Sequence, residues 1–251
     1  MRIDTPGAAR ALSAAASQIA QVAVFSTALL LLFCPSILES GSLMRGSVLH
    51  PSPQNQLTAT PVAGVLRLPV ADFGGVEPSA QARAFADWVA GANDNKGTTF
   101  VVIDKKEARL YVFDGKRRLS AMSAVLLGAA QGDETVPGIG DRPIALVQPN
   151  ERTTPAGRFV AERGRNARGE DVVWVDYDAA VSMHRVVTSD ATERRLERLA
   201  SPSAEDNRIS YGCINVPVAF YEAHIRPAFA HHSGIVHVLP DFATIHQVFG
   251  V

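Results

Sequence analysis

Cysteine, net charge and clustered histidine are all scarce in this 251-residue sequence. The 24 Lys and Arg residues nearly balance the 25 Asp and Glu residues, so the formal net charge is -1. This balance gives no bulk attraction to nucleic acid or to anionic membranes. The seven histidines are scattered and supply no convincing ligand set for a metal. We therefore expect no nucleic-acid partner, metal or cofactor, and the informative features are local.

The N-terminus has the pattern of an export signal. Arg2 and Arg10 precede an uncharged apolar run at residues 19–34. The run is near the length at which a signal peptide and a short membrane span are hard to distinguish. A buried helix of a cytosolic domain is disfavoured because nothing nearby could cover it. We expect residues 1–40 to be a signal peptide or an inner-membrane anchor, and the protein to be exported to the cell envelope, in the periplasm.

This interpretation changes the meaning of the two cysteines. If Cys34 belongs to the signal or anchor, Cys213 is the only thiol of the exported portion. Structural cysteines in an oxidising compartment normally occur in pairs. Cys213 is therefore buried and inert, paired between chains, or reactive, and the composition alone does not choose among these.

Changes in composition and periodicity divide the rest of the chain into three segments. Residues 41–77 are rich in Pro, Ser, Gly and Gln and predict a flexible linker. Residues 78–96 predict a short helix packed on the main domain, because Phe85, Trp88 and Val89 recur at helical spacing, with Gly91 as the stop. Residues 97–251 form the predicted main domain.

Most of this main domain reads as short strands rich in β-branched and aromatic residues. Between them, residues 129–155 predict loops and one short strand. Short strands at hairpin spacing favour a mainly β fold, a largely antiparallel sandwich or barrel, with a few short helices. The predicted strands cover residues 98–104, 108–114, 120–128, 157–162, 171–177, 179–186 and 234–240.

Two helices interrupt the strands. The first is predicted over residues 189–200 with Ser189 as its N-cap, and the second follows Cys213. For the basic side chains of the first helix, a solvated face is favoured over binding of an anionic substrate group. These side chains are Arg194, Arg195 and Arg198.

The stretch ISYGCINVP, residues 209–217, contains the candidate nucleophile. Attack on an acyl carbon needs a thiolate, a base, and donors for the developing oxyanion. Gly212, just before Cys213, lets the backbone fold tightly so that successive N–H groups converge. His184 ends an apolar strand where the chain departs for the loop that returns at Cys213, and a nearby imidazole favours the thiolate.

Three blocks of the sequence resemble the L,D-transpeptidases of the YkuD type. ISYGCIN resembles their signature of an upstream His, then Ser/Thr-His-Gly-Cys, a hydrophobic residue, and Asn or Arg. TTFVVIDKKEARLYVFDGKR resembles their opening strands, and ERTTPAGRFVAE resembles their TPTGxF segment. The blocks occur in the family's order, and the similarity covers residues 98–241.

The resemblance implies the β-sandwich or barrel-like L,D-transpeptidase fold, and it assigns roles. Cys213 would be the nucleophile and His184 its base or ion-pair partner. The backbone N–H groups of Gly212 and Cys213, with Tyr211, would form the oxyanion hole, while Ser210 and Asn215 would hold the turn and position substrate. The expected partners are peptidoglycan stem peptides, and the expected assembly is a monomer. Two further side chains are predicted to bind substrate, namely Arg185 and Arg208.

The implied reaction is acyl transfer on peptidoglycan. The cysteine would attack the carbonyl of the third residue of a stem tetrapeptide, at its L-centre, and release the terminal D-alanine. An amine of a neighbouring stem would resolve the thioester as a 3→3 cross-link, whereas water would give L,D-carboxypeptidase activity. The alternative is a non-catalytic envelope protein of the same fold that binds peptidoglycan or a partner.

Two departures from the family pattern lie at the site. Tyr211 stands where the family has a second histidine, and Arg185 stands where a glycine often follows the first. The 29 positions from His184 to Cys213 (213 minus 184) exceed the usual spacing. Residues 188–208 would be an insertion that flanks the cleft as a lid or restricts the acceptor. A papain-like peptidase is disfavoured because its cysteine precedes its histidine, and a structural β-domain because three blocks match.

Overall fold

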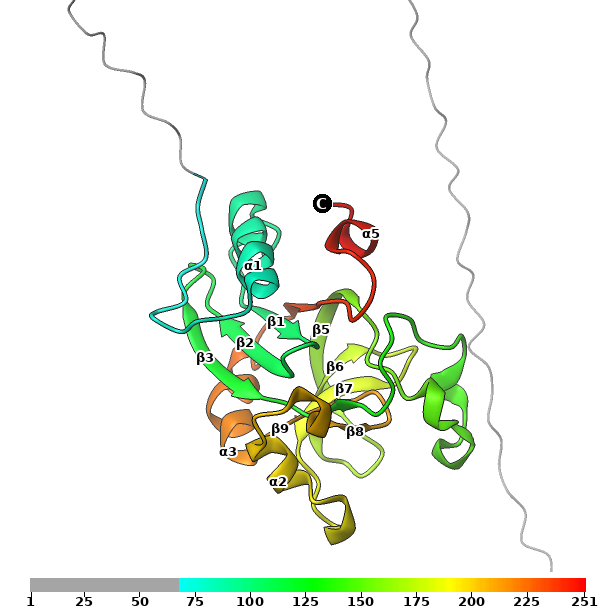
Figure 1. The fold of residues 1–251 in the computed structure, drawn as a ribbon. Helices are drawn as coiled ribbons and strands as arrows, with labels where there is room; N and C mark the ends of the chain where they lie inside the picture. Colours follow the sequence, from blue (N-terminus) through cyan, green and yellow to red (C-terminus); the bar gives the residue numbers. More distant parts are fainter. Residues whose placement is uncertain (1–67) are drawn as a thin grey trace, which may run out of the picture. The chain divides into compact units, whose positions relative to one another are not determined.

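The computed structural model describes residues 68–251 (Figure 1). The predicted signal or anchor, residues 1–40, and residues 41–67 of the predicted linker lie outside the described residues. Within the described part of the chain, no helix is both long enough and apolar enough to cross a membrane.

A single curved sheet of eight strands dominates the fold. Its order is β3-β2-β1-β10-β5-β6-β7-β9, and a two-stranded sheet pairs β4 with β8. The first half of the large sheet contains β1 (Phe100–Asp104), β2 (Arg109–Phe113), β3 (Leu119–Ala124) and β10 (Gly234–Val238). The second half contains β5 (Gly157–Arg165), β6 (Asp171–Asp176), β7 (Val181–Arg185) and β9 (Ile214–Val216). The small sheet pairs β4 (Leu127–Gly128) with β8 (Arg208–Ser210).

The long strand β5 bends the sheet toward a barrel. Its first half pairs with β10 and its second half pairs with β6. At the other edge, Leu126 and Asn215 exchange two backbone hydrogen bonds of 2.9 Å, which join the segment after β3 to β9. The prediction of a mainly β, barrel-like fold with a few short helices is confirmed. The pairing is less antiparallel than predicted, because β1–β10, β7–β9 and β4–β8 are parallel.

Both faces of β1 are covered, so all five of its residues are buried. Val101 and Ile103 face the core inside the curved sheet, whereas Phe100 and Val102 face a second core outside it. The four consecutive apolar residues of FVVI, without alternation, are what a strand buried on both faces requires. The second core lies beneath α1 (Ala80–Ala92), whose residues Phe85 and Val89 are buried in it.

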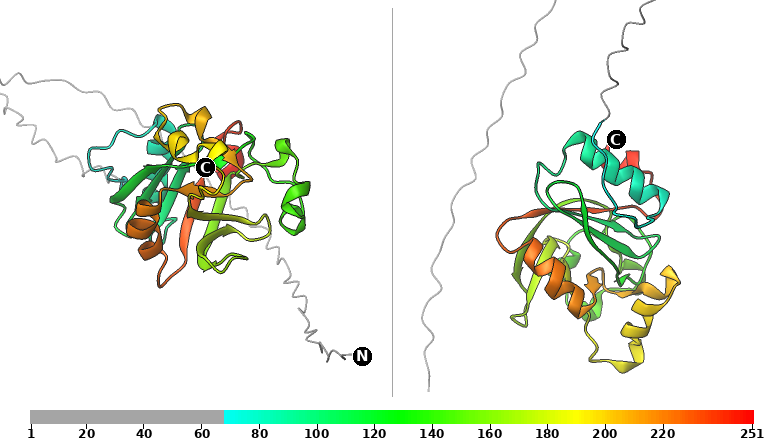
Figure 2. Two further views of the ribbon diagram at one scale, coloured as in Figure 1. Left: turned by 90° about the horizontal axis from the view of Figure 1, so that it is seen from below. Right: turned by 90° about the vertical axis from the view of Figure 1, so that its left-hand side faces the viewer.

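The ends of α1 follow ordinary capping rules. The Ser79 hydroxyl accepts a hydrogen bond from the Ala82 N–H at the start. The helix passes through Gly91, which was predicted as the stop, and ends at Asn93, whose φ of 54° is left-handed. The short C-terminal helix α5 (Ile245–Phe249) lies near α1 in Figure 1 and in the right-hand view of Figure 2, and the Phe85 and Phe249 ring centroids are 4.4 Å apart.

Three sequence predictions of elements need correction. The strand predicted over residues 120–128 is two strands, β3 and β4, in different sheets, because Val125 and Leu126 bend into the core between them. The strand predicted within residues 129–155 is not there. That segment contains three 3-10 turns and stands away from the barrel (Figure 1). These turns are Ile139–Asp141, Ile144–Leu146 and Pro149–Glu151.

The helix predicted over residues 189–200 is broken. Asp190, rather than Ser189, caps a 3-10 turn at Ala191–Glu193 through the Thr192 N–H. Arg194 then adopts a left-handed φ of 51°, so α2 covers only Arg195–Ala200. A further 3-10 turn, Ala204–Asn207, leads into β8.

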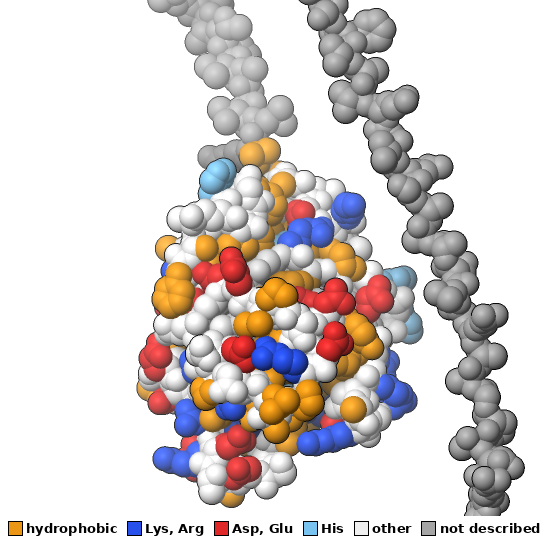
Figure 3. All heavy atoms as spheres, turned by 90° about the vertical axis from the view of Figure 1, so that its right-hand side faces the viewer, with side chains coloured by type: hydrophobic (Ala, Val, Ile, Leu, Met, Phe, Trp, Pro, Cys, Tyr) orange, Lys and Arg blue, Asp and Glu red, His pale blue; other side chains and the backbone are white. Residues whose placement is uncertain are grey.

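The helix predicted after Cys213 is present as one helical stretch with a π turn in the middle. It comprises α3 (Val218–Phe220), the π turn (Tyr221–Ile225) and α4 (Arg226–Ala228). Tyr221 and Ile225 are buried in the inner core. On the face shown in Figure 3, apolar, basic and acidic side chains are intermixed, with no field of a single charge.

Candidate active site

Cys213 lies on the tight turn that joins β8 to β9, and its side chain is half-buried. Gly212, the residue before it, has a φ of +125°. A Cβ atom at this position would lie 2.7 Å from the carbonyl oxygen of Thr153. Both the backbone angle and the close approach of Thr153 therefore require glycine here.

Ser210 holds the turn from within. Its hydroxyl donates to the Cys213 carbonyl at 2.6 Å and accepts from the Gly212 N–H at 3.1 Å. The expectation that the Gly212 N–H serves an oxyanion hole thus needs correction, since Ser210 already takes it. The backbone N–H groups of Tyr211 and Cys213 donate to no group among residues 68–251 and are the donors left for an oxyanion.

The sheet brings His184 and Cys213 together despite their separation in sequence. Strands β7 and β9 are parallel neighbours, with Met183 opposite Ile214 and His184 opposite Asn215. The Nδ1 atom of His184 lies 2.7 Å from the Arg185 carbonyl oxygen. A carbonyl only accepts, so Nδ1 carries the proton and donates it. The Nε2 atom then faces the Asn215 amide nitrogen at 3.3 Å.

Ser182 is a neighbour of the thiol that sequence reasoning missed. It alternates with His184 on β7, so both side chains leave the same face of the strand. Its Oγ lies 3.7 Å from Cys213 Sγ, and the sulfur is also 3.5 Å from the Ala180 carbonyl oxygen. The period-two spacing of Ser182 and His184 was the available signal.

The thiol and the imidazole shift each other's pKa. Burial raises the pKa of Cys213, but contact with His184 and hydrogen bonds from Ser182 outweigh burial, and the pKa is lowered. Burial lowers the pKa of His184, but the cysteine outweighs it, and this pKa is raised. Both directions favour a thiolate–imidazolium pair, the arrangement that activates a cysteine nucleophile.

A cavity of about 370 Å³ opens over the thiol, and four of the other predicted site residues line it with Cys213. These are His184, Ser210, Tyr211 and Asn215. A neighbouring hollow of about 460 Å³ meets it at Glu170, His184 and Val187. The Tyr211 ring forms part of the wall, with the Arg152 guanidinium carbon 4.0 Å from its centroid.

The two arginines predicted to bind substrate are held in ion pairs. Arg185 lines the neighbouring hollow, pairs with Asp171 at 3.0 Å and also contacts Glu222. Arg208 pairs with Asp241 at 2.7 Å and does not line the cysteine cavity. The structure therefore brings Arg185 close to the site and keeps Arg208 away from it.

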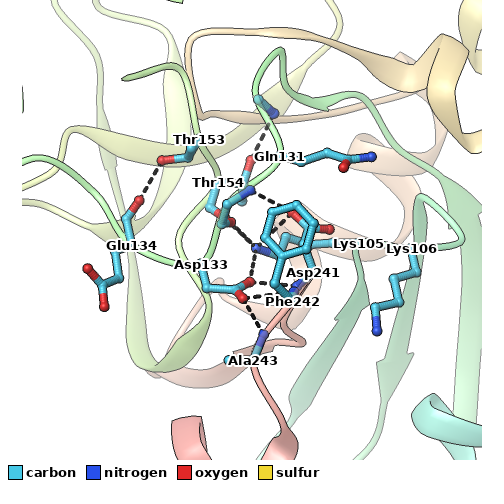
Figure 4. Close-up of polar contacts among 12 residues, drawn as sticks. Lys105, Lys106, Gln131, Asp133, Glu134, Thr153, Thr154, Asp241, Phe242 and Ala243 are labelled. Carbon is cyan, nitrogen blue, oxygen red and sulfur yellow. Dashed lines mark hydrogen bonds and ion pairs between the residues drawn. The ribbon is translucent and has the colours of Figure 1, made fainter. Parts of the chain in front are cut away.

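A buried charge cluster (Figure 4) is connected to the cysteine turn through Thr154. Lys105 is fully buried and pairs with Asp133 at 3.0 Å and with Asp241 at 3.3 Å. Its ammonium also donates to the Thr154 carbonyl, while the Thr154 hydroxyl donates to the Gly212 carbonyl at 2.8 Å. The cluster thus supports the turn through Thr154.

Asp133 is a carboxyl of this cluster with a strongly lowered pKa. Burial raises its pKa, but backbone N–H groups of residues 241–243 and the Lys105 ammonium outweigh burial and bring the pKa down to about 2. Asp133 therefore stays ionised at neutral pH and ties the C-terminal segment to the back of the site.

Arg195 departs from the prediction of a solvated basic face. Its side chain is 12% exposed, whereas that of the adjacent Arg194 is 70% exposed. Arg195 pairs with Glu193 and donates to the Asn215 side chain. The sequence does not indicate which of the three arginines points toward the protein, because their directions depend on the break in the helix at Arg194.

Within residues 68–251, no group of three or more His, Cys, Asp and Glu side chains is placed to hold a metal ion.

No protein-family model matches the sequence, and no curated protein matches it. Solved structures do. The catalytic domain of an E. faecium L,D-transpeptidase is 17% identical with a TM-score of 0.30, and the alignment covers 57% of this chain and 98% of that one. An L,D-transpeptidase from Mycobacterium smegmatis is 15% identical with a TM-score of 0.33, covering 56% and 58%. One from Xylanimonas cellulosilytica is 14% identical with a TM-score of 0.35, covering 57% and 60%. The chain spans about three fifths of the length of the last two.

Proposed function

We propose that this protein is a cysteine-dependent L,D-transpeptidase that transfers acyl groups of peptidoglycan stem peptides in the cell envelope. One observation carries the proposal: the thiol of Cys213, with a lowered pKa, meets His184 at a glycine turn in an open cavity. The stretch ISYGCIN, which resembles the family signature except at Tyr211, occupies this turn. A reactive thiol accounts for the geometry better than a buried inert cysteine, because Cys213 is only partly buried and lines the cavity.

The first half-reaction forms a thioester. The Cys213 thiolate attacks the carbonyl carbon of the third stem residue, and the carbonyl oxygen takes up the negative charge. The N–H groups of Tyr211 and Cys213 are the available donors for that oxyanion. When the tetrahedral intermediate collapses, the bond to D-alanine breaks, and the His184 imidazolium gives its proton to the leaving amine.

The second half-reaction reverses these roles. An amine of another stem attacks the thioester carbon, and neutral His184 removes the proton from that amine. The C–S bond then breaks, the acyl group leaves as the 3→3 cross-link, and the thiolate is restored. Water in place of the amine gives a free tripeptide. The neighbouring hollow shares His184 with the cysteine cavity, and we assign it to the acceptor stem, whose amine needs that base.

The test is mass spectrometry of the full-length protein incubated with disaccharide-tetrapeptide. We expect release of D-alanine, an acyl adduct on Cys213, and a cross-linked dimer. Cys213→Ala should lower D-alanine release by roughly 10³-fold or more, because no covalent intermediate can form. Its circular dichroism spectrum should match that of the unchanged protein.

Each product selects one function. Dimer supports the transpeptidase, and tripeptide alone identifies the L,D-carboxypeptidase. Binding without any product identifies the non-catalytic envelope protein. Full activity of Cys213→Ala would overturn the mechanism.

A further inference from the structure

Arg195 reaches into the active-site cavity from the inserted segment, residues 188–208. Its guanidinium Nη1 lies 2.5 Å from the Asn215 side-chain oxygen, and its Nε lies 2.6 Å from a Glu193 carboxylate oxygen. Arg195, Asn215, His184 and Cys213 all line the same cavity. The insertion therefore supplies a charged side chain to the residue that faces the base.

The contact fixes which way the Asn215 amide points. A guanidinium has five donors and no acceptor, so the amide atom that faces it must be the oxygen. The amide nitrogen consequently points at His184 Nε2, at 3.3 Å, and at the Cys213 carbonyl, also at 3.3 Å. Asn215 is 1% exposed, so water does not offer it other partners.

We propose that Arg195 is a positioning residue that controls the proton on His184 by holding the Asn215 amide with its N–H toward Nε2. An N–H facing Nε2 favours a lone pair on that atom and keeps the ring proton on Nδ1, where the Arg185 carbonyl accepts it. The proposal rests on the proposed function and adds to it a source of control outside the ISYGCIN signature.

Two opposing influences then meet at the imidazole. The cysteine raises the pKa of His184, and the positive charge of Arg195 lowers it. A base that must accept a proton in one half-reaction and return it in the other works best when neither form is strongly favoured. The charge of Arg195 therefore limits how far the thiolate raises the pKa of His184.

Removal of Arg195 leaves the Cys213 carbonyl as the remaining acceptor that favours this orientation of the Asn215 amide, so the amide turns more readily. Its oxygen would then face Nε2 and accept a hydrogen bond from the imidazolium, which a charge-assisted bond stabilises. His184 would hold its proton more tightly and remove one poorly from the incoming amine. The other charged residues near the His184 ring are the same in the unchanged protein and in a variant that lacks Arg195. They are Arg165, Arg168, Glu170, Asp171, Arg185, Asp190 and Glu193.

The test compares Arg195→Met, Arg195→Lys and a matched control, Arg194→Met, in the full-length chain. Arg194 is the adjacent exposed arginine and does not line the cavity. Three quantities are measured at one neutral pH: the ¹⁵N shifts of the His184 ring, assigned by difference with His184→Gln, the rate of Cys213 alkylation by iodoacetamide, and D-alanine release.

For Arg195→Met we expect the ¹⁵N shifts of the His184 ring to move toward imidazolium values, and alkylation of Cys213 to be at least as fast as in the unchanged protein. D-alanine release should slow roughly tenfold, which is the equivalent of one hydrogen bond to a charged group. Arg195→Lys keeps a charged donor and should restore the ring shifts. Arg194→Met should change none of the three.

Unchanged ring shifts in Arg195→Met would overturn the proposal. So would a parallel loss of alkylation and release, which general damage to the fold produces. The ring shifts and alkylation need no peptidoglycan substrate, so they decide the role of Arg195 even if the proposed function fails.

Discussion

His184 and His237 both lie on strands, and each meets an ionisable partner, yet their properties are opposite. His237, on β10, is fully buried against the Phe85 ring, and its Nε2 lies 2.9 Å from an Asp94 carboxylate oxygen. Burial nevertheless lowers its pKa to about 4. His184, half-buried at the cavity, has its pKa raised by a cysteine.

The partners differ in what else they bind. Both oxygens of Asp94 already accept from the Arg158 guanidinium, at 2.8 and 3.0 Å, so its charge is shared. Within residues 68–251, the side-chain neighbours that lower the pKa of Cys213 are His184 and Ser182, neither of which is a fixed cation. Burial is the main cause of the lowered pKa of His237, and the nearby Arg158 charge adds to it, so Asp94 does not restore the proton. At His184 the cysteine outweighs burial, and the pKa of the imidazole rises.

The largest expected effect separates the two histidines by activity. His184→Gln should slow D-alanine release by roughly 10²- to 10⁴-fold, because a positioned acid–base group contributes about that much. His237→Gln should leave release within about threefold of the unchanged protein, since His237 lies outside the cavity and packs against aromatic rings. Rates measured on disaccharide-tetrapeptide check both. Equal losses in the two variants would contradict the assignment of His184 as the base.

The second prediction concerns stability in acid. The folded-state pKa of His237, about 4, lies below its ordinary value of 6.5. The unfolded chain therefore takes up this proton first as the pH falls, so the stabilisation is complete above 6.5 and is lost progressively down to about 4. The loss is on the order of 3 kcal/mol. Urea unfolding between pH 7 and 4 measures it, and His237→Leu should flatten the curve in that window. An unchanged slope in His237→Leu would assign the acid sensitivity to other groups.

The smallest effect is expected at Tyr211, where the family pattern has a second histidine. The Arg152 guanidinium stacks on its ring, an interaction of about 0.5–1 kcal/mol at an exposed site. Tyr211→Ala should lower the free energy of unfolding by about that amount, whereas Tyr211→Phe keeps the ring and should not. Urea unfolding at neutral pH checks both variants. A loss in Tyr211→Phe equal to that in Tyr211→Ala would place the contribution in the hydroxyl.

Features that depend on the local sequence pattern were predictable from the sequence. Short β-branched segments gave most of the strands, because alternation and turn residues are local properties. The pairing of His184 with Cys213 followed from a strand end and a glycine turn. The unalternating burial of β1, and the division of residues 120–128 between two sheets, depend on partners far along the chain.

The supporting contacts of the site could not be predicted for the same reason. Lys105 reaches Thr154 across 49 positions, and Arg195 reaches Asn215 across 20. Nothing in the sequence marks Lys105 as the buried member of an adjacent lysine pair or Arg195 as the inward member of three arginines. Such choices are made by tertiary packing, which overrides local propensity.

The parallel pairing of β7 with β9 sets the separation between His184 and Cys213. This separation depends on which residues of the two strands are opposite each other. It does not depend on the number of residues in the connection between the strands. We therefore expect that segments of different length and composition could replace the connection after Val186 without changing the separation between His184 and Cys213. The connection is the place where this scaffold can acquire new control over the base, or new substrate contacts, while the nucleophile stays in place.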